Sequence, residues 1–403
     1  MNRSRMTATV LAALSLFAAF PGAPFELAPA VAEAETTGPL FMENLGWGLP
    51  LKIDSVDSGP ARLLFDGTPD EKDLPMARAL ERYSAEDARA SEELLRDLRV
   101  RRADRRAVSF LESRVSYPAQ KRARCTIHGK TFDTATGREL SFDDVFTDRV
   151  QLANEIAYRL SIIYPGRFPS SSLGNSEYDA FAEKVGRVME NDEFAWSLDP
   201  FGATFYFNPG TLTSDPCGDI STVTFCFAYT PYHFRPAYRS CPESFCMETE
   251  PGLPTVLCFD EQPDMPTEIT IGPETAPGVV IRRNGTEFFD PGEVLNVRPV
   301  FVMTDDRRKY LYIDCSMAAL NPMHELRVYD LCGDEIRRVE CDSHFTMLAT
   351  EPSDEKHRAW HVMTDPEDFV LTRTDTPFLE DFVHCRVGAD GSPVIIGTLS
   401  ARP

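Results

Sequence analysis

Positive charge is scarce in this sequence of 403 residues, in which 41 lysine and arginine residues stand against 63 aspartate and glutamate residues. The formal net charge at neutral pH is therefore −22. A surface with this charge repels phosphate groups, which argues against nucleic acids and anionic membranes as partners. Apolar residues make up 42% of the chain, which is enough for packed cores and excludes a wholly disordered protein.

Sequence motifs of catalysis are missing as well. The chain has no Gly-x-Ser-x-Gly, no His-Glu-x-x-His and no phosphate-binding glycine loop. No pattern points to a bound metal ion or organic cofactor, so we expect none. These absences favour a non-enzymatic protein over an enzyme. An exported hydrolase that acts on glycans or peptides through scattered carboxylates stays open as the alternative.

The N-terminus has the pattern of a signal peptide at residues 1–32. Two arginines precede an apolar run at residues 6–20, which is shorter than the about 20 residues that a transmembrane helix needs. Small residues then predict cleavage after Ala32, with Ala34 as second choice. An uncleaved anchor is the alternative. No later stretch is long and apolar enough to span a membrane, so the sequence predicts a secreted or otherwise extracytoplasmic protein.

Ten cysteines follow this segment, and an even number is typical of disulfide-bonded exported proteins. They are Cys125, Cys217, Cys226, Cys241, Cys246, Cys258, Cys315, Cys332, Cys341 and Cys385. The close spacing of Cys241 and Cys246 makes them a candidate disulfide. Packed free thiols are the alternative, which the strand-like surroundings favour for Cys226. Metal binding is disfavoured because no two cysteines have the Cys-x2-Cys spacing of a zinc site.

Helix-like and strand-like apolar spacing alternate between residues 75 and 262. We expect helices near residues 75–83, 84–98, 147–163 and 176–189, and strands near residues 107–113, 125–132, 194–198, 203–207 and 220–229. Elements in this order predict an α+β fold with helices packed on an antiparallel sheet. After residue 279, an Asn284-Gly285 hairpin signal and several short strands predict a mostly-β C-terminal domain.

Prolines gather at residues 263–278, which indicates a linker between two domains. The predicted division is an irregular lead-in at residues 33–74, an α+β extracytoplasmic domain at residues 75–262, this Pro-rich linker, and a β-rich domain at residues 279–403.

Three charged segments invite a functional interpretation. Residues 96–106 carry six arginines and two aspartates, which we interpret as the solvated face of a helix rather than an anion site. His357 and His361 would be metal ligands on one helical face, but their segment looks more like the entry into a strand. Asp143 and Asp144 precede a helix, where capping is favoured over acid–base chemistry.

A series of short motifs runs through the middle of the chain: Arg102-Ala103-Asp104, Thr131-Phe132-Asp133-Thr134-Ala135-Thr136-Gly137, Phe142-Asp143-Asp144-Val145-Phe146, Phe194-Ala195-Trp196-Ser197-Leu198 and Phe205-Tyr206-Phe207-Asn208-Pro209. Over about residues 75–245, this series resembles an uncharacterised bacterial extracytoplasmic family, domain of unknown function 3298. Its relatives form the outer domain of lysozyme-sensing anti-sigma factors and accessory domains of some peptidoglycan deacetylases. The resemblance implies a fold and a compartment, and it names no catalytic residue.

Aromatic residues gather in the sequence around the loop that follows this series. We take Tyr206, Asn208, Tyr229, Tyr232 and Tyr238 as a candidate ligand face, because tyrosines at loop edges often anchor partners. Together with the resemblance, this predicts an envelope-associated binding protein. Its expected partner is a cationic protein such as lysozyme, which suits the negative charge, or a cell-wall component. A structural surface protein that self-associates is a further alternative.

Overall fold

The computed structural model describes residues 42–45, 48–56, 61–87, 95–116, 124–172, 174–216, 218–258, 267–273, 278–317, 323–341, 344–349, 357–374 and 381–399. Residues 39–403 form one compact unit. The predicted signal peptide and its cleavage sites at Ala32 and Ala34 lie outside the described residues.

The protein is mostly β, with 47% of the structure in strands and 18% in helices. The first half contains the strands β1 (Met42–Glu43), β2 (Leu51–Val56), β3 (Arg62–Phe65), β4 (Leu95–Ala103), β5 (Ala107–Ser116), β6 (Arg124–Asp133), β7 (Ala195–Asp199), β8 (Gly202–Phe207) and β9 (Ser221–Cys226), and the helices α2 (Leu74–Asp87), α3 (Phe142–Val145), α4 (Arg149–Ile163) and α5 (Ser176–Glu190). The second half contains β10 (Cys241–Pro242), β11 (Phe245–Glu248), β12 (Thr255–Leu257), β13 (Thr267–Pro273), β14 (Gly278–Arg283), β15 (Thr286–Pro291), β16 (Asn296–Met303), β17 (Lys309–Met317), β18 (Met323–Asp330), β19 (Arg337–Val339), β20 (Phe345–Thr346), β21 (His357–Val362), β22 (Phe369–Arg373), β23 (Asp381–Val387) and β24 (Pro393–Leu399).

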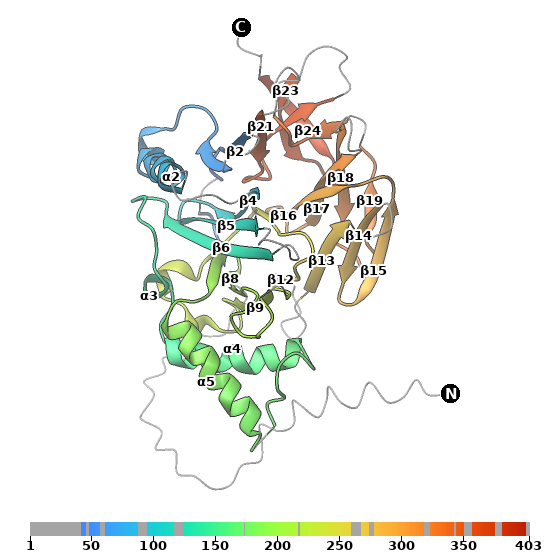
Figure 1. The fold of residues 1–403 in the computed structure, drawn as a ribbon. Coiled ribbons are helices and arrows are strands. Elements are labelled where there is room, and N and C mark those ends of the chain that lie inside the picture. The colour runs from blue at the N-terminus through green and yellow to red at the C-terminus, as the bar shows by residue number, and fades with distance from the viewer. Residues whose placement is uncertain are drawn as a thin grey trace, which may run out of the picture. The chain divides into compact units, whose positions relative to one another are not determined.

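The predicted α+β fold class is wrong. The described strands form seven small sheets of two to five strands, the largest in the order β11-β16-β17-β18-β19. Helices α4 and α5 lie side by side and share a hydrophobic core with one small sheet, β7-β8-β9 (Figure 1). The cores around the larger sheets contain no residue of a described helix. The prediction failed because it extended the local arrangement around α4 and α5 to the whole of residues 75–262.

Strand β4 occupies most of the charged segment at residues 96–106, which was predicted as a solvated helix face. The helix predicted at residues 84–98 is also wrong. The first residues of this segment belong to α2 and the last belong to β4. Both faces of β4 are buried: Leu98 and Val100 alternate with Arg99 and Arg101. This period of two is the signal of a strand, and the charge obscured it.

Predicted elements that depend only on residues close together in the sequence are confirmed. Helix α4 begins where Asp148 accepts a hydrogen bond from the N–H of Gln151 at 2.9 Å. Strands β14 and β15 form the predicted hairpin, in which Asn284 and Gly285 both have positive φ, 50° and 79°. Such a turn matches the right-handed twist of the two strands, and asparagine and glycine tolerate it best.

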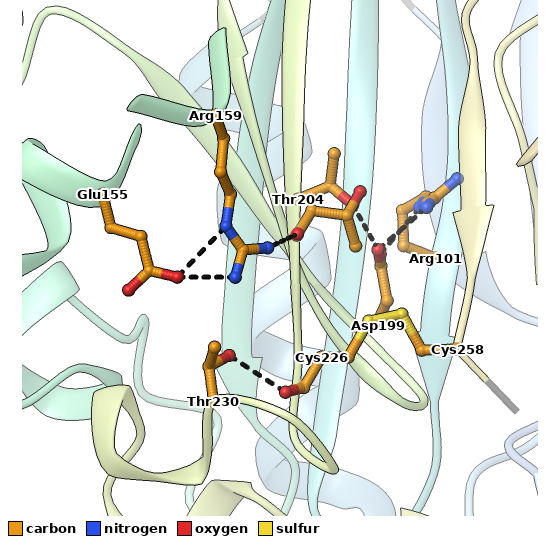
Figure 2. The surroundings of a disulfide bond; sticks show 9 residues. Arg101, Glu155, Arg159, Asp199, Thr204, Cys226, Thr230 and Cys258 are labelled. Atoms are coloured by element: carbon orange, nitrogen blue, oxygen red, sulfur yellow. Dashed lines mark hydrogen bonds and ion pairs between the residues drawn. A yellow bond between two sulfur atoms is a disulfide. The ribbon is translucent and has the colours of Figure 1, made fainter. Parts of the chain in front are cut away.

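Buried arginine–carboxylate pairs connect β4 to other sheets. Arg101 is 2% exposed and binds Asp199 at the end of β7 through two hydrogen bonds, Nε to Oδ1 at 2.8 Å and Nη2 to Oδ2 at 2.9 Å. Its Nη1 donates to the carbonyl oxygen of Glu248 on β11 at 3.1 Å. The hydroxyl of Thr204 completes the shell of Asp199 at 2.7 Å, and Figure 2 shows this group beside a disulfide bond.

A second buried pair joins β4, β11 and β16. Arg298 binds Glu248 through Nε to Oε1 at 2.8 Å and through Nη2 to Oε2 at 2.9 Å. The same Nη2 donates to the carbonyl of Leu98 at 2.8 Å, and the N–H of Val100 donates to Glu248 at 2.6 Å. Buried charges of this kind cost several kcal/mol each in desolvation, which only such complete hydrogen bonding offsets.

The disulfide bond joins Cys226 at the end of β9 to Cys258, with Cα atoms 5.9 Å apart (Figure 2). The free thiol that the sequence favoured at Cys226 is therefore not found. Cys241 and Cys246, the candidate disulfide, are buried free cysteines. The reason is packing, because their side chains belong to two different hydrophobic cores. A disulfide bond fits an extracytoplasmic protein, since such compartments are oxidising.

Strand pairing joins segments on either side of the predicted linker at residues 263–278. Strand β2 pairs with β21, and β11 pairs with β16. Strand β13 lies within the linker segment itself and pairs with β12 and β14. The predicted domain boundaries stay a prediction.

The buried pair of Arg101 and Asp199 generates a stability prediction. Asp199 is fully buried, so Arg101→Met leaves a charge without its partner. We expect this variant to lower the free energy of unfolding by about 3–5 kcal/mol in denaturant titrations. The matched control is Arg187→Met on α5, whose ion pair with Glu183 is exposed on both sides and contributes at most about 1 kcal/mol. Equally small losses of unfolding free energy in the two variants would contradict the assignment of Arg101 and Asp199 as a buried, stabilising ion pair.

Candidate functional site

A cavity of about 150 Å³ lies where strands β2, β21, β22 and β23 meet. Part of its wall is apolar. Five of the residues that line it are ionisable: Asp66, His361, Asp365, Asp368 and His384. Ligand sites combine an apolar wall with a few polar groups that orient the ligand, and this cavity has both.

The pair of Asp66 and His361 lies at the centre of this group. Strand β2 pairs with β21 so that Lys52 is opposite His361, and with β3 so that Leu51 is opposite Phe65. Asp66 directly follows Phe65, which brings its Oδ2 to 2.8 Å from Nδ1 of His361. The register of two strand pairs therefore fixes the contact between residues from the two ends of the chain.

The carboxylate of Asp66 fixes the orientation of the His361 ring. Burial alone would raise the pKa of Asp66, but the hydrogen bond and charge of His361 and the charge of Lys52 outweigh it, and the pKa lies below its usual value. A carboxylate only accepts hydrogen bonds, so Nδ1 of His361 is the donor in this pair. His361 is 7% exposed, and within the described part of the chain its Nε2 has no hydrogen-bond partner.

A second Asp–His pair lines the same cavity. His384 on β23 and Asp368, just before β22, have Nδ1 and Oδ1 2.7 Å apart. Strands β22 and β23 place Val370 opposite His384, so Asp368 is two residues from that register position and on the same face. This pair is more exposed than the pair of Asp66 and His361.

Asp365 contributes a buried carboxyl group whose pKa is shifted in the opposite direction to that of Asp66. It is 8% exposed and accepts a hydrogen bond from the N–H of Glu367 at 2.9 Å. Burial, together with the nearby charge of Asp368, raises its pKa above the usual value in spite of this bond. The cavity thus contains one carboxyl group whose charged form is favoured, at Asp66, and one whose charged form is disfavoured, at Asp365.

Together these groups offer hydrogen-bond acceptors to a ligand. The carboxylate oxygens of Asp365 and Asp368 accept from N–H or O–H donors. The site is therefore suited to a ligand with several donors, or with a positive charge. Among the described residues, no three His, Cys, Asp or Glu side chains are grouped so that they could hold a metal ion.

The structure places the five residues of the candidate ligand face in different surroundings. Tyr206, Tyr229 and Tyr238 pack in or against three different hydrophobic cores. Burial raises the pKa of Tyr206 to about 12. Asn208 binds the main chain of β6 through two hydrogen bonds to Ile127, at 2.7 and 2.9 Å.

Tyr232 is the exposed member of the five, at 53%. Its hydroxyl donates to Glu155 on α4, which also contacts His233 and Arg159. The five residues are thus not brought together on one open surface. Their role in binding stays a prediction.

The sequence singled out His361 but not the cavity that it lines. His361 was compared with His357, and the structure confirms that this segment is a strand, β21. The partner of His384 is Asp368, 16 positions earlier in the chain. The sequence signal for the cavity was the acidic turn Thr364-Asp365-Pro366-Glu367-Asp368, which lies between two apolar strand patterns. One histidine, His361, precedes this turn, and another, His384, follows it.

Across residues 42–399, wherever the structure is described, no helix has the length and apolar character needed to cross a membrane.

Comparison with solved structures gives a weak similarity. A crystal structure of a member of the DUF3298 family from Bacteroides fragilis matches with a TM-score of 0.26 and 13% sequence identity, over 40% of this chain and 64% of that chain. The chain thus spans less than two thirds of that structure's length, and a similarity of this extent carries no argument about fold or function. This is the family that the sequence motifs resemble, and membership stays a prediction. No protein family profile and no curated protein matches the chain.

The two central carboxyl groups generate opposite stability predictions. Because the folded protein raises the pKa of Asp365, its contribution to stability is present at low pH and is lost as the pH rises. Asp365→Asn removes the buried charge and keeps an acceptor for Glu367. We therefore expect this variant to unfold at a higher temperature than the wild type at pH 7, with a gain that shrinks towards about pH 4.

Asp66→Asn is the matched control for this experiment. The pKa of Asp66 is lowered by folding, so its contribution is present at neutral pH and is lost as the pH falls. This variant should unfold at a lower temperature than the wild type at pH 7. Shifts of the same sign in both variants, measured by thermal unfolding monitored by circular dichroism, would contradict the description of the cavity.

Proposed function

We propose that the protein is an exported, non-enzymatic binding protein of the cell envelope, and that the cavity of Asp66 and His361 holds a positively charged group of its partner. The observation that carries the proposal is the convergence of three carboxyl groups, those of Asp66, Asp365 and Asp368, on one small cavity. The partner is a cationic protein such as lysozyme, or an amine-bearing component of the cell wall.

The charge of the whole chain supports a cationic partner. A net charge of −22 creates a negative field that attracts cations and accelerates their encounter with the protein. Surface charge alone would attract any cation. The cavity adds the shape and the hydrogen bonds that select one group among them.

The compartment is part of the same proposal. The predicted signal peptide places the protein outside the cytoplasm, where lysozyme and cell-wall polymers are encountered. The bond between Cys226 and Cys258 is compatible with that location.

Calorimetry with lysozyme tests the partner. We expect residues 33–403 to bind lysozyme at low ionic strength and more weakly at 0.5 M salt, because screening removes the long-range part of the attraction. Asp365→Asn should weaken binding more than Asp334→Asn, which removes the same charge at an exposed position outside the cavity. Equal weakening in the two variants would mean that only net charge matters. No binding of lysozyme or of solubilised wall fragments at either salt concentration would overturn the proposal.

A second function, hydrolysis of glycans or peptides, is favoured by one observation. Asp66 accepts a hydrogen bond from Nδ1 of His361, which is how an aspartate orients a general-base histidine in hydrolases. Such a base would take a proton from an attacking water molecule. Asp365, with its raised pKa, would give a proton to the leaving group.

Incubation with purified peptidoglycan separates the two functions. Hydrolysis predicts release of reducing sugar ends or free amino groups, and a loss of about 100-fold or more in rate with His361→Gln. Simple binding predicts no release with either protein. Release that His361→Gln leaves unchanged would exclude this cavity as the catalytic site.

A further inference from the structure

We propose that the exposed side of helix α4 is a docking surface for an amphipathic helix of a partner protein, whose apolar side contacts α4 and whose remaining residues are mainly basic. The inference goes beyond the proposed function, because the residues that line the cavity of Asp66 and His361 belong to other elements than α4 and α5. It assigns the protein a second contact surface.

All residues of α4 are described, and none of those that are exposed is charged. They are Val150, Gln151, Asn154, Tyr158, Ile162 and Ile163, and we call them the α4 face. Val150, Tyr158 and Ile162 are 73%, 47% and 55% exposed. With Asn154 they lie in one row, because residues four positions apart follow one another along a helix. An uncharged surface with exposed aliphatic and aromatic side chains is typical of a protein interface.

Helix α5 lies beside α4 and has the ordinary surface of a solvated helix (Figure 1). Its exposed charged residues are Glu177, Asp179, Glu183, Arg187 and Glu190. The lack of charge on the α4 face is therefore a property of that one helix. It is not shared by the neighbouring helix on the same hydrophobic core.

Tyr232 extends the apolar surface beyond α4. It is more than half exposed, and its hydroxyl donates to Glu155 of α4 at 3.4 Å. Tyrosine is frequent among the residues that dominate binding energies, because it combines a large apolar ring with a polar hydroxyl. The surface thus has two exposed tyrosines, Tyr158 and Tyr232.

Helices α4 and α5 are antiparallel neighbours. Arg149, at the start of α4, donates to the carbonyl oxygen of Met189 near the end of α5. At the opposite end of the pair, Tyr158 is close enough to Tyr178 of α5 to contribute, after burial, to the raised pKa of the Tyr178 phenol. Tyr178 therefore marks the side of α5 that is next to the α4 face.

Small residues continue this side of α5. Ala182 and Gly186 follow Tyr178 at intervals of four residues, so the three lie in one row. A Cβ atom at Gly186 would contact no other part of the protein within 4 Å, so packing inside the protein does not require a glycine there. Glycine also disfavours a helix interior. At this position it leaves space in which the backbone of a partner can approach closely.

Charge complementarity selects a basic partner. The exposed charged residues at the ends of the α4 face are acidic: Asp148 caps the start of α4, and Glu177 and Asp179 lie in the first turn of α5. The arginines of the two helices are already paired with carboxylates, and they are Arg149, Arg159 and Arg187. Basic residues on both sides of an apolar stripe would meet the acidic groups while the stripe covers the α4 face.

Other occupants meet these charges less well. A second copy of the chain would bring acidic residues against acidic residues, and an anionic membrane would do the same. The row from Val150 to Ile162 is about 18 Å long at the rise of an α-helix, so an occupant of about three to four turns covers it.

The test is a calorimetric titration of residues 33–403 with three synthetic peptides of this length at low ionic strength. The first consists of leucine and lysine, with leucines at i, i+3, i+4 and i+7. The second has the same composition in shuffled order, so that no apolar side forms. The third keeps the leucine pattern and has glutamate in place of lysine. We expect one equivalent of the first peptide to bind at least about tenfold more tightly than either of the others.

Substitutions on the α4 face locate the binding. Tyr158→Ala and Ile162→Ala should each weaken the leucine–lysine peptide by at least about tenfold, and both side chains are exposed, so the fold does not depend on them. The matched control is Ile396→Ala on β24, which removes a similarly exposed apolar side chain outside the two helices and should leave the affinity unchanged.

A substitution at Gly186 tests the space beside the row without weakening the fold. Gly186→Lys fills that space and adds a charge of the partner's sign, so it should weaken the leucine–lysine peptide by at least about tenfold. Lysine favours a helix more than glycine does, so this variant should be at least as stable as the wild type in thermal unfolding. Ala180→Lys adds the same charge to an exposed position on another side of α5 and should change the affinity less.

Three outcomes would overturn the proposal. The first is equal affinity for the three peptides. The second is equal affinity of the leucine–lysine peptide for Tyr158→Ala, Ile162→Ala and Ile396→Ala. The third is a dimer in analytical ultracentrifugation that Tyr158→Ala makes monomeric, because a second copy of the chain would then cover the α4 face.

Discussion

Arg101 and Arg298 are buried guanidinium groups, and each of them has to meet a buried carboxylate. Arg101 pairs with Asp199 of β7 in another sheet, whereas Arg298 pairs with Glu248 of β11, the neighbouring strand of its own sheet. Glu248 also accepts a hydrogen bond from the main chain of β4. A buried charge without its partner costs several kcal/mol, so these strands separate only together with their ion pairs. The sheets are small, with two to five described strands each, and hydrophobic cores lie around them. Burial of these cores stabilises the unit, and the ionic contacts fix which strands meet.

One of these buried arginines also contacts β21, the strand that carries His361 of the cavity. The guanidinium carbon of Arg298 lies 5.6 Å from the centre of the Trp360 ring. Side chains alternate along a strand, so Trp360 faces the arginine on one side of β21 while His361 faces Asp66 on the other. Strand β21 is thereby fixed between the buried ion pairs and strand β2.

Local sequence was sufficient where neighbours along the chain set the conformation, as with the Asp148 cap of α4 and the Asn284-Gly285 turn. It failed at β4, where the partners of the arginines are far away: Arg101 and Asp199 are 98 positions apart, and Val100 and Glu248 are 148 apart. When those partners are unknown, a run of arginines indicates a solvent-exposed segment. The cavity was beyond prediction for the same reason, since Asp66 and His361 are 295 positions apart. The tyrosines around residue 208 gave a stronger local signal, but the structure distributes them over several cores.

The proposed function places a cationic group of the partner in the cavity of Asp66 and His361. The most direct measurement is nitrogen NMR of the histidine side chains at neutral pH, before and after addition of lysozyme, with His361→Gln used to assign the signals. We predict that Nδ1 of His361 carries a proton that is hydrogen-bonded to Asp66, and that the partner shifts the His361 signals. An Nδ1 without a proton, or His361 signals that the partner leaves unchanged, would contradict the account.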